Sequence, residues 1–403
     1  MKNIKIGIIK EGKIPVDHRV ALTPDHCRIL LQKYSGLEIK VEPSDIRCFE
    51  DDEYVAAGAQ LSSELEDCDV LFGVKEVPID KLISNKKYLF FSHTIKKQAY
   101  NQSLLKAVVD RKIQLIDYEC LRNETGRVVA FGRWAGIVGA YNAMWTYGQK
   151  YGAFSIRRAN ECFDKEELWS ELPKIKLPNI KIAITGAGRV AQGAIEVLEA
   201  LGIRKVSKDE YLNQQFDSAV YCQLNVCDYT ERIDGEKFEA KIFFKNPEGH
   251  RSSFLPCTKV SDMFIAAAYW DPNAPVLFTK EETQADDFSI KVIADITCDI
   301  EGSVPTTIDA TTIADPVFDF DLSSWTRKEA FSLRDGLSVM SVDNLPCELP
   351  RDASVSFGDQ LLKYVADELL VAEGPIVKGA SITLLDGSLN EPYHYLKDYL
   401  AGE

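Results

Sequence analysis

The stretch Lys181-Ile-Ala-Ile-Thr-Gly-Ala-Gly-Arg-Val-Ala-Gln-Gly193 decides the fold class of this chain. A short apolar run passes directly into Gly186-x-Gly188-x-x-Ala191, and residues with helical spacing follow. In a dinucleotide-binding turn, Gly186 would make the tight bend, Gly188 would let the backbone approach a pyrophosphate, and Ala191 would allow close helix packing. The pattern predicts a Rossmann-type unit, although a purely structural tight turn fits the same residues.

Strand-like and helix-like segments alternate on both sides of this turn. The expected strands are short, apolar and rich in β-branched residues: Ile4 to Ile9, Leu37 to Val41, Val70 to Val74, Tyr88 to Phe91, Ile113 to Ile116, Ser218 to Tyr221, Met263 to Ala267, Val292 to Asp295 and Val339 to Val342. One expected helix begins at Pro24. The others cover Gln98 to Val109, Trp134 to Tyr151, Ala194 to Leu201 and Phe357 to Leu370. This alternation predicts an α/β protein with mostly parallel sheets.

Composition narrows the classes of function. The chain has 62 acidic and 47 basic residues and a formal net charge of -15, which argues against nucleic-acid binding. The ten cysteines are scattered without a C-x-x-C motif, so neither a zinc site nor a disulfide framework is expected. Met1 to Lys10 lacks the apolar core of a signal peptide, and no long uncharged apolar run occurs. We therefore expect a cytoplasmic protein that uses no metal and has no membrane partner.

The nucleotide preference depends on the residues after the second strand of the Rossmann unit. An acid is expected about 20 residues past the glycines if the cofactor is NAD, because a carboxylate accepts a hydrogen bond from the ribose hydroxyl. Here the expected second strand, Ile203 to Val206, ends in Ser207-Lys208-Asp209, and Arg189 lies in the glycine turn. A hydroxyl and cations at this place favour NADP(H). NAD(H) remains possible if Asp209 reaches the ribose or Lys208 is only a solvated surface cation.

Two side chains at strand ends are candidates for proton transfer. Lys75, followed by Glu76, closes one expected strand, and His93 closes the next. Adjacent parallel strands end at the same edge of a sheet, where open α/β sheets bind ligands. A lysine and a histidine there can exchange protons with a substrate if their pKa values are suitably lowered. Each alone also fits an ordinary role, as a solvated lysine or a core histidine.

Further polar residues lie in turns beside these strand ends. Arg19 and Arg127 have guanidinium groups that can bind a carboxylate in bidentate fashion, and Gln98 lies nearby. The carboxylates of Glu11 and Glu119 are candidates for holding a catalytic lysine. All of these residues are also compatible with a surface position.

Taken together, several motifs resemble one enzyme family. They are KEG and HRVALTP within Lys10 to Pro24, VKEVP at Val74 to Pro78, GRVVAFG at Gly126 to Gly132, the glycine turn, and SVDNLP at Ser341 to Pro346. This set resembles the lysine-forming saccharopine dehydrogenases of the alanine dehydrogenase and transhydrogenase superfamily. The stretch from Ala266 to Asp359 resembles most the reductase half of the aminoadipic semialdehyde synthases, which is NADPH-linked. The stand-alone fungal enzymes use NAD, carry an aspartate after the second strand and tend to have an arginine where this chain has Gly126.

The resemblance implies an architecture and an activity. It implies two Rossmann-like domains with parallel sheets and the active site in the interdomain cleft, residues 1–133 plus 347–403 forming the substrate domain and residues 134–346 the dinucleotide domain. The implied reaction interconverts L-lysine, 2-oxoglutarate and NAD(P)H with saccharopine, NAD(P)+ and water. Alanine dehydrogenase shares the RVALTP, VKE and His pattern and is the first alternative. A non-catalytic nucleotide-binding relative is the second.

The resemblance also implies roles for individual residues. Lys75 would be the general base, His93 the general acid, and Glu119 would tune them. The implied substrate-binding residues are Arg19, Gln98, Arg127, Phe131, Ala267, Ala268 and Tyr269. The implied cofactor-binding residues are Arg189, Val190, Val342, Asp343, Asn344 and Leu345. They join Gly186 and Gly188 of the glycine turn and Ser207 and Lys208 after the second strand.

Overall fold

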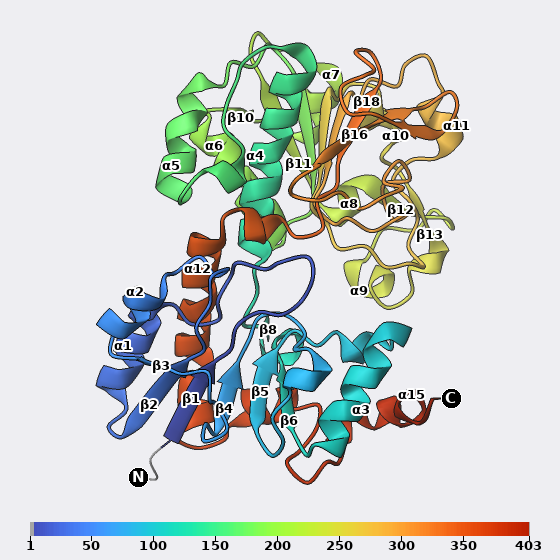
Figure 1. The fold of residues 1–403 in the computed structure, drawn as a ribbon. Coiled ribbons are helices and arrows are strands. Elements are labelled where there is room, and N and C mark those ends of the chain that lie inside the picture. The colour runs from blue at the N-terminus through green and yellow to red at the C-terminus, as the bar shows by residue number, and fades with distance from the viewer. Residues whose placement is uncertain (1–3, 403) are drawn as a thin grey trace. The chain divides into compact units, whose positions relative to one another are not determined.

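The chain folds into two compact units in the computed structural model, which describes residues 4–402. Unit 1 contains the chain up to Phe131 and again from Pro350 onward, and unit 2 is the continuous segment Gly132–Leu349. Figure 1 follows the chain through both units by colour. Each unit has its own sheet and hydrophobic core.

Unit 1 is built on a six-stranded sheet with the order β3-β2-β1-β4-β5-β6, in which every pairing is parallel (Figure 1). Its central strands are almost continuously buried, as expected when helices cover both faces of a parallel sheet. Its strands are β1 (Ile4–Ile8), β2 (Leu37–Val41), β3 (Gln60–Leu61), β4 (Val70–Phe72), β5 (Lys87–Phe90) and β6 (Gln114–Asp117), with a hairpin of β7 (Arg122–Asn123) and β8 (Gly126–Arg127). The expectation of a parallel sheet in this part of the chain is confirmed.

Helices of unit 1 come from both ends of the chain. They are α1 (Pro24–Lys33), α2 (Asp51–Ala56), α3 (Gln102–Asp110), α12 (Pro350–Tyr364), α13 (Ala366–Leu370), α14 (Pro375–Ala380) and α15 (Lys397–Ala401). The single helix expected over Phe357 to Leu370 is wrong, because the helical backbone breaks at Val365 and α13 begins after it. His26 of α1 contacts Asp359 of α12 at 3.2 Å, so the C-terminal segment packs on the N-terminal one.

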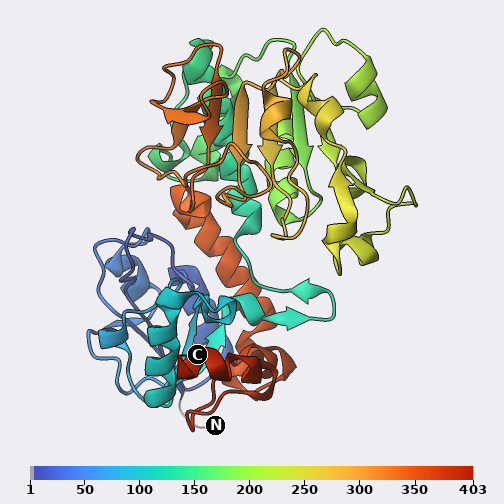
Figure 2. The same ribbon diagram turned by 90° about the vertical axis from the view of Figure 1, so that its right-hand side faces the viewer.

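Unit 2 contains an eight-stranded sheet with the order β10-β11-β9-β14-β15-β18-β16-β17, seen in Figure 2. Its strands are β9 (Lys181–Thr185), β10 (Arg204–Lys205), β11 (Val220–Leu224), β14 (Met263–Ala266), β15 (Val292–Asp295), β16 (Val317–Asp321), β17 (Thr326–Lys328) and β18 (Leu337–Met340), and β12 (Thr230–Arg232) pairs separately with β13 (His250–Ser252). Pairings from β10 to β18 are parallel, whereas β16 and β17 run antiparallel. The antiparallel edge and the extra hairpin were not foreseen.

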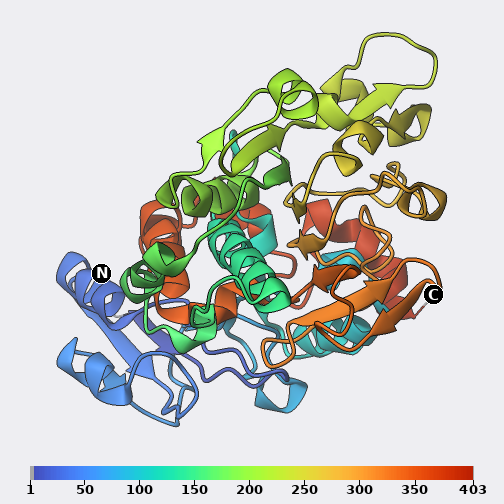
Figure 3. The ribbon, with the colours of Figure 1, turned by 90° about the horizontal axis from the view of Figure 1, so that it is seen from above.

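Helices of unit 2 are α4 (Gly132–Tyr151), α5 (Lys165–Glu171), α6 (Arg189–Ala200), α7 (Lys208–Asn213), α8 (Val226–Tyr229), α9 (Ala240–Phe243), α10 (Leu255–Thr258) and α11 (Lys280–Thr283). α4 and α6 lie side by side (Figure 3) and approach closely at two glycines. A Cβ on Gly193 would lie 2.0 Å from the carbonyl oxygen of Arg133, and one on Gly136 would lie 1.9 Å from that of Val190. Ala191 is fully buried, but these two glycines set the distance between the helices. No helix within residues 4–402 is long and apolar enough to span a membrane.

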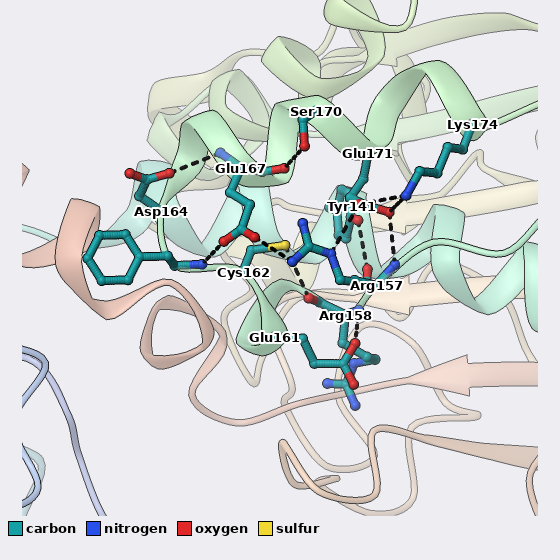
Figure 4. Close-up of polar contacts among 11 residues, drawn as sticks. Tyr141, Arg157, Arg158, Glu161, Cys162, Asp164, Glu167, Ser170, Glu171 and Lys174 are labelled. Carbon is teal, nitrogen blue, oxygen red and sulfur yellow. Dashed lines mark hydrogen bonds and ion pairs between the residues drawn. The ribbon is translucent and has the colours of Figure 1, made fainter.

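The segment after α4 is held by a network of charged groups, shown in Figure 4. Arg157 donates from Nη1 to Glu167 at 2.5 Å and from Nε to Glu171 at 3.0 Å. Lys174 also pairs with the buried Glu171, at 2.7 Å, and the hydroxyl of Tyr141 donates to the carbonyl of Arg157. These contacts fasten α5 to α4, and they act together with the buried side chains of Leu168 and Leu172.

The strand order of unit 2 corrects one sequence-based expectation. The second strand in sequence, β10, lies at the outer edge of the sheet, and β11 pairs directly with β9. The register runs to the ends of both strands, with Leu224 opposite Thr185. The residues that follow β11 therefore lie beside the carboxyl end of β9, whereas Ser207 and Lys208 follow the edge strand β10.

Candidate functional site

Lys75 lies just beyond β4 in a segment fixed by a carboxylate. The side chain of Glu11 accepts hydrogen bonds from the backbone N–H groups of Val74, at 2.6 Å, and Lys75, at 2.9 Å. Burial, followed by the charge of Arg19, lowers the pKa of Lys75, although the nearby carboxylate of Asp17 opposes the shift. Lowering this pKa increases the neutral amine fraction, which is the form that accepts a proton.

His93 is oriented by the residue that follows Lys75. Its Nδ1 lies 2.6 Å from Oε1 of Glu76, whose Oε2 lies 2.6 Å from Nζ of Lys13. Burial opposes ionisation of Glu76, but the hydrogen bonds from His93 and Lys13 prevail and lower its pKa to about 2. The carboxylate therefore accepts from Nδ1–H of His93, which leaves Nε2 as the ring nitrogen for exchange with a substrate. His93 has a φ of 52°, a left-handed conformation held at the end of β5.

Arg19 is buried and paired with an acid, whereas a residue that binds the substrate directly should be accessible to it. It is 4% exposed, and its Nε and Nη2 donate to the two carboxylate oxygens of Asp17 at 2.9 and 2.5 Å. The guanidinium also lies over the ring of Phe131, 4.2 Å from its centroid, and Phe131 stacks on Phe357 at 4.2 Å. Arg19 and Phe131 thus form one packed cluster beside Lys75, with the planar fork of the arginine engaged by Asp17.

The remaining candidates of unit 1 differ in exposure. Arg127, half-buried on β8, lies 3.9 Å from Oε1 of Glu119, and Lys96 lies 3.4 Å from the same oxygen. The other oxygen, Oε2 of Glu119, is buried without a hydrogen-bond partner among residues 4–402. Gln98 is exposed, and its Oε1 accepts from the hydroxyl of Tyr100 at 3.0 Å. The side chain of Glu119 therefore lies near Lys96 and Arg127, whereas Glu76 is the acid in direct contact with His93.

Unit 2 contains a cavity of about 530 Å³ at the carboxyl ends of β9, β11 and β14. The glycine turn from Gly186 to Val190 forms one wall. Asn225 and Val226, after β11, and Ala267 to Tyr269, after β14, lie beside it, while Tyr229, Phe243, Phe244 and Trp270 contribute aromatic rings. The edge formed by strand carboxyl ends is where open α/β sheets bind ligands, and the volume suits an organic molecule.

The glycine turn has the geometry of a phosphate-binding turn. Gly186 has a φ of 103°, and a Cβ there would lie 2.8 Å from the carbonyl oxygen of Ala267. Gly188 precedes the first residue of α6, and the space that its Cβ would fill is open. An added side chain would block this approach, so the turn fits a pyrophosphate drawn to the N-terminus of the twelve-residue helix α6. The residues present thus fit a dinucleotide.

Two expected groups of cofactor residues lie outside this cavity. The hydroxyl of Ser207 caps α7 together with Glu210, and Nζ of Lys208 donates to the carbonyl of Asp228 at 2.5 Å. The segment Val342 to Leu345 does not line the cavity either, and both Val342 and Leu345 are buried. In contrast, Ala267, Ala268 and Tyr269, expected near the substrate, line the same cavity as the glycines.

Several residues that shape these sites were missed by sequence analysis. Asn225 and the aromatic residues between β11 and β14 were overlooked, because that region has no regular apolar period and was assigned no element. Asp17, which engages Arg19, was also overlooked. A signal for Glu76 was present, since it adjoins Lys75, but its bond to His93 joins two strands and is not visible in a linear pattern.

This chain is similar in sequence to several known enzymes. The family described as alanine dehydrogenase/PNT, N-terminal domain, matches residues 7–138. The mouse mitochondrial alpha-aminoadipic semialdehyde synthase is 29% identical over 94% of this chain, which spans 46% of that protein. The lysine-forming, NAD(+)-linked saccharopine dehydrogenase of Yarrowia lipolytica is 27% identical, with 89% of this chain and 90% of the other aligned. The resemblance to these two groups is confirmed.

Solved structures support the fold. An L-alanine dehydrogenase matches with a TM-score of 0.64 and 17% identity, covering 99% of both chains. A transhydrogenase from Sinorhizobium meliloti matches with a TM-score of 0.61 and 17% identity, covering 96% of this chain and 99% of the other. At this level of identity the likeness establishes the Rossmann-like α/β architecture and leaves the chemistry to the residues of the site.

Proposed function

We propose that this chain is a pyridine-nucleotide-dependent oxidoreductase that interconverts L-lysine, 2-oxoglutarate and NAD(P)H with saccharopine, NAD(P)+ and water. The observation that carries the proposal is the short bond between His93 and Glu76, the residue next to Lys75. This bond holds His93 close to the segment that carries Lys75, so that an imidazole and an amine lie at neighbouring strand ends. The 27–29% identity to saccharopine dehydrogenase and aminoadipic semialdehyde synthase supports the choice of substrates.

The proposed chemistry assigns one proton transfer to each group. The ε-amine of lysine adds to the ketone of 2-oxoglutarate, water leaves, and the resulting imine is reduced. The nicotinamide supplies the hydride when the cofactor is bound. Lys75, with its lowered pKa, accepts the proton released at nitrogen. His93 donates a proton from Nε2 to the carbinolamine oxygen so that water can depart, while Glu76 holds the ring at Nδ1.

The substrate carboxylates require cationic partners in unit 1. Arg127 is the half-buried arginine of the set, and we assign it to binding a carboxylate in bidentate fashion. Gln98 contributes an exposed amide. Arg19 is engaged by Asp17, and we assign it to keeping positive charge next to Lys75, whose pKa it lowers. Glu119 positions Arg127 and Lys96.

The second candidate function is an alanine dehydrogenase type of reaction. The match of residues 7–138 to the alanine dehydrogenase/PNT N-terminal domain favours it. In both candidates, the turn from Gly186 to Val190 would hold the pyrophosphate of the cofactor. The candidates differ in the amine and the ketone, which the cavity of unit 2 does not distinguish.

Steady-state assays separate these candidates. NADPH and NADH oxidation is measured with lysine plus 2-oxoglutarate, and separately with ammonia plus pyruvate. We expect nucleotide oxidation only when lysine and 2-oxoglutarate are both present. A rate found only with ammonia and pyruvate would replace the proposal with the alanine dehydrogenase reaction. Nucleotide binding without turnover on either pair would indicate a non-catalytic relative.

A further inference from the structure

The residue that reads the adenosine ribose is set by the order of strands in unit 2. In a Rossmann unit, the ribose lies beyond the strand beside the one that leads into the glycine turn. Two strands pair with β9, namely β11 and β14, and β11 comes first in the chain. In the 3-2-1-4 order of a Rossmann sheet it therefore takes the place of the second strand, and its pairing with β9 ends at Leu224 and Thr185. The residue after Leu224 is Asn225. We infer that Asn225 is the ribose-reading residue of this chain and, with Arg189, selects NADPH; the inference rests on the function proposed above.

Direct contacts join the end of β11 to the glycine turn. The N–H of Gly186 donates to the carbonyl of Leu224 at 2.8 Å. The side-chain amide of Gln223 donates to the carbonyl of Gly186 at 3.0 Å, and Nζ of Lys205 donates to Oε1 of Gln223 at 2.7 Å. These bonds hold Leu224, the residue before Asn225, against Gly186, the first glycine of the turn that is proposed to hold the pyrophosphate. Asn225 is exposed and lines the cavity together with Gly186, Gly188 and Arg189.

The strand β10 ends before it reaches the edge of the sheet where the ribose would lie, so the residues after it are not placed to contact the ribose. The N–H of Val206 bonds to the carbonyl of Tyr221, so β10 leaves the sheet level with the middle of β11. Ser207 then caps α7, and Lys208 donates to the carbonyl of Asp228 from outside the cavity lining. Neither Ser207 nor Lys208 lines the cavity, whereas Asn225, which also caps a helix, does.

Two residues of the cavity lining, Asn225 and Arg189, suit a phosphorylated ribose. A carboxylate at the position of Asn225 would accept from a free 2′-hydroxyl and repel a 2′-phosphate, whereas the neutral amide does not repel the phosphate. Among the cavity-lining residues the structure describes, Arg189 is the one Lys or Arg and Asp271 is the one Asp or Glu. Arg189 lies in the turn itself and supplies a guanidinium suited to phosphate.

Substitution of Asn225 tests this assignment without disturbing the local fold. Asn225 is the N-cap of α8, with a reciprocal cap to Asp228, and Asp or Ser serves equally well as an N-cap. Wild type, Asn225→Asp, Asn225→Ser and Lys208→Met are titrated with NADPH and with NADH by nucleotide fluorescence, without substrate. The readout is the ratio of the two dissociation constants, which a change in the folded fraction of the protein would not alter.

We expect wild type and Asn225→Ser to bind NADPH more tightly than NADH. Asn225→Asp should weaken NADPH binding at least about tenfold, because two like charges are brought together, and should leave NADH binding intact or stronger. Lys208→Met should keep the wild-type ratio. The inference is overturned if Asn225→Asp keeps the ratio, or if Lys208→Met loses the NADPH preference. A wild-type chain that binds neither nucleotide would overturn the proposed function as well, so the two failures are distinguishable.

Discussion

At the scale of single residues, the most informative group is the carboxylate of Glu76. It adjoins Lys75 in sequence and contacts both His93 and Lys13 in space, each at 2.6 Å. One acid thus fixes a histidine ring and a cation around the position of the proposed base. Its low pKa is the result of these two bonds overcoming the cost of burial. The proposed function of the site and part of its stability therefore depend on the same bonds.

Replacing the proposed proton-transfer groups tests the catalytic assignment. Lys75→Met and His93→Gln should each lower kcat by about 100- to 10,000-fold, because each removes a group that moves a proton in the reaction. Lys81→Met is the matched control, an exposed lysine of the same unit outside the proposed site. Steady-state kinetics with lysine and 2-oxoglutarate measures all three variants. Full activity in both Lys75→Met and His93→Gln would show that the assignment is wrong.

Glu76 also predicts how stability depends on pH. Its folded-state pKa of about 2 lies below the ordinary value of 4.5, so its contribution is present above about pH 4.5 and is lost as the pH falls toward 2. At pH 7 we expect Glu76→Gln to reduce the free energy of unfolding by an amount on the order of 2 kcal/mol. Denaturant unfolding at pH 7 and at pH 3 measures the difference between variant and wild type. A difference that does not shrink at pH 3 would contradict this account of Glu76.

At the scale of elements, the best example of tight packing is the contact of α4 and α6. Both helices are largely buried on the facing sides, and Gly136 and Gly193 let their backbones approach more closely than any side chain would allow. Since α6 begins at the glycine turn, the contact with α4 also determines where the turn lies. The glycines of this helix pair thus help to position the turn that is proposed to hold the nucleotide.

A single methyl group should disturb this contact. In Gly193→Ala the new Cβ would lie 2.0 Å from the backbone oxygen of Arg133, so the helices must separate. We expect a loss of about 3 kcal/mol in the free energy of unfolding, as in overpacked cores. Gly249→Ala is the control in the same unit, because nothing lies within 4 Å of the added Cβ. Equal stability of the two variants, measured by denaturant unfolding, would rule out close packing at Gly193.

Sequence patterns predicted elements better than their arrangement. Three strands, Leu37–Val41, Lys181–Thr185 and Val292–Asp295, have the expected bounds because each is a short run dominated by apolar and β-branched residues. The place of β10 at the sheet edge was not predictable, since a local pattern holds no information about which strands pair. For this reason the sequence pattern pointed to Ser207 and Lys208 as the residues near the ribose, whereas Asn225 is the residue proposed for that place above. The His93–Glu76 bond was missed for the same reason, because it joins residues 17 positions apart.

At the scale of the whole molecule, the charge of the chain and the charge of its sites differ. The net charge is -15, yet the proposed ligands, a dinucleotide and 2-oxoglutarate, are anions. Long-range attraction therefore does not favour their binding, and local cations must provide it. In the proposed function Arg189 would serve this part in unit 2 and Arg127 in unit 1, while Arg19 is paired with Asp17 and Lys208 lies outside the cavity lining. Under this proposal, recognition of the anions would depend on few cations.

The division into units predicts the behaviour of a fragment. Unit 2 is one continuous segment, 132–349, with its own sheet, core and cavity, whereas unit 1 combines two segments. A continuous unit with its own core is expected to fold alone. The fragment 132–349 should therefore unfold in one cooperative transition and bind NADPH within about tenfold of the affinity of the full chain.

Circular dichroism during thermal unfolding and a fluorescence titration with NADPH test this fragment. Gly186→Ala within it is the control, because the added Cβ would meet the carbonyl of Ala267 at 2.8 Å in a left-handed backbone. That variant should lose nucleotide binding, since the turn can no longer keep its shape against β14. A fragment without a cooperative transition would show that unit 2 depends on unit 1 for folding. A folded fragment that binds no NADPH would show that the cavity of unit 2 is not sufficient for the nucleotide.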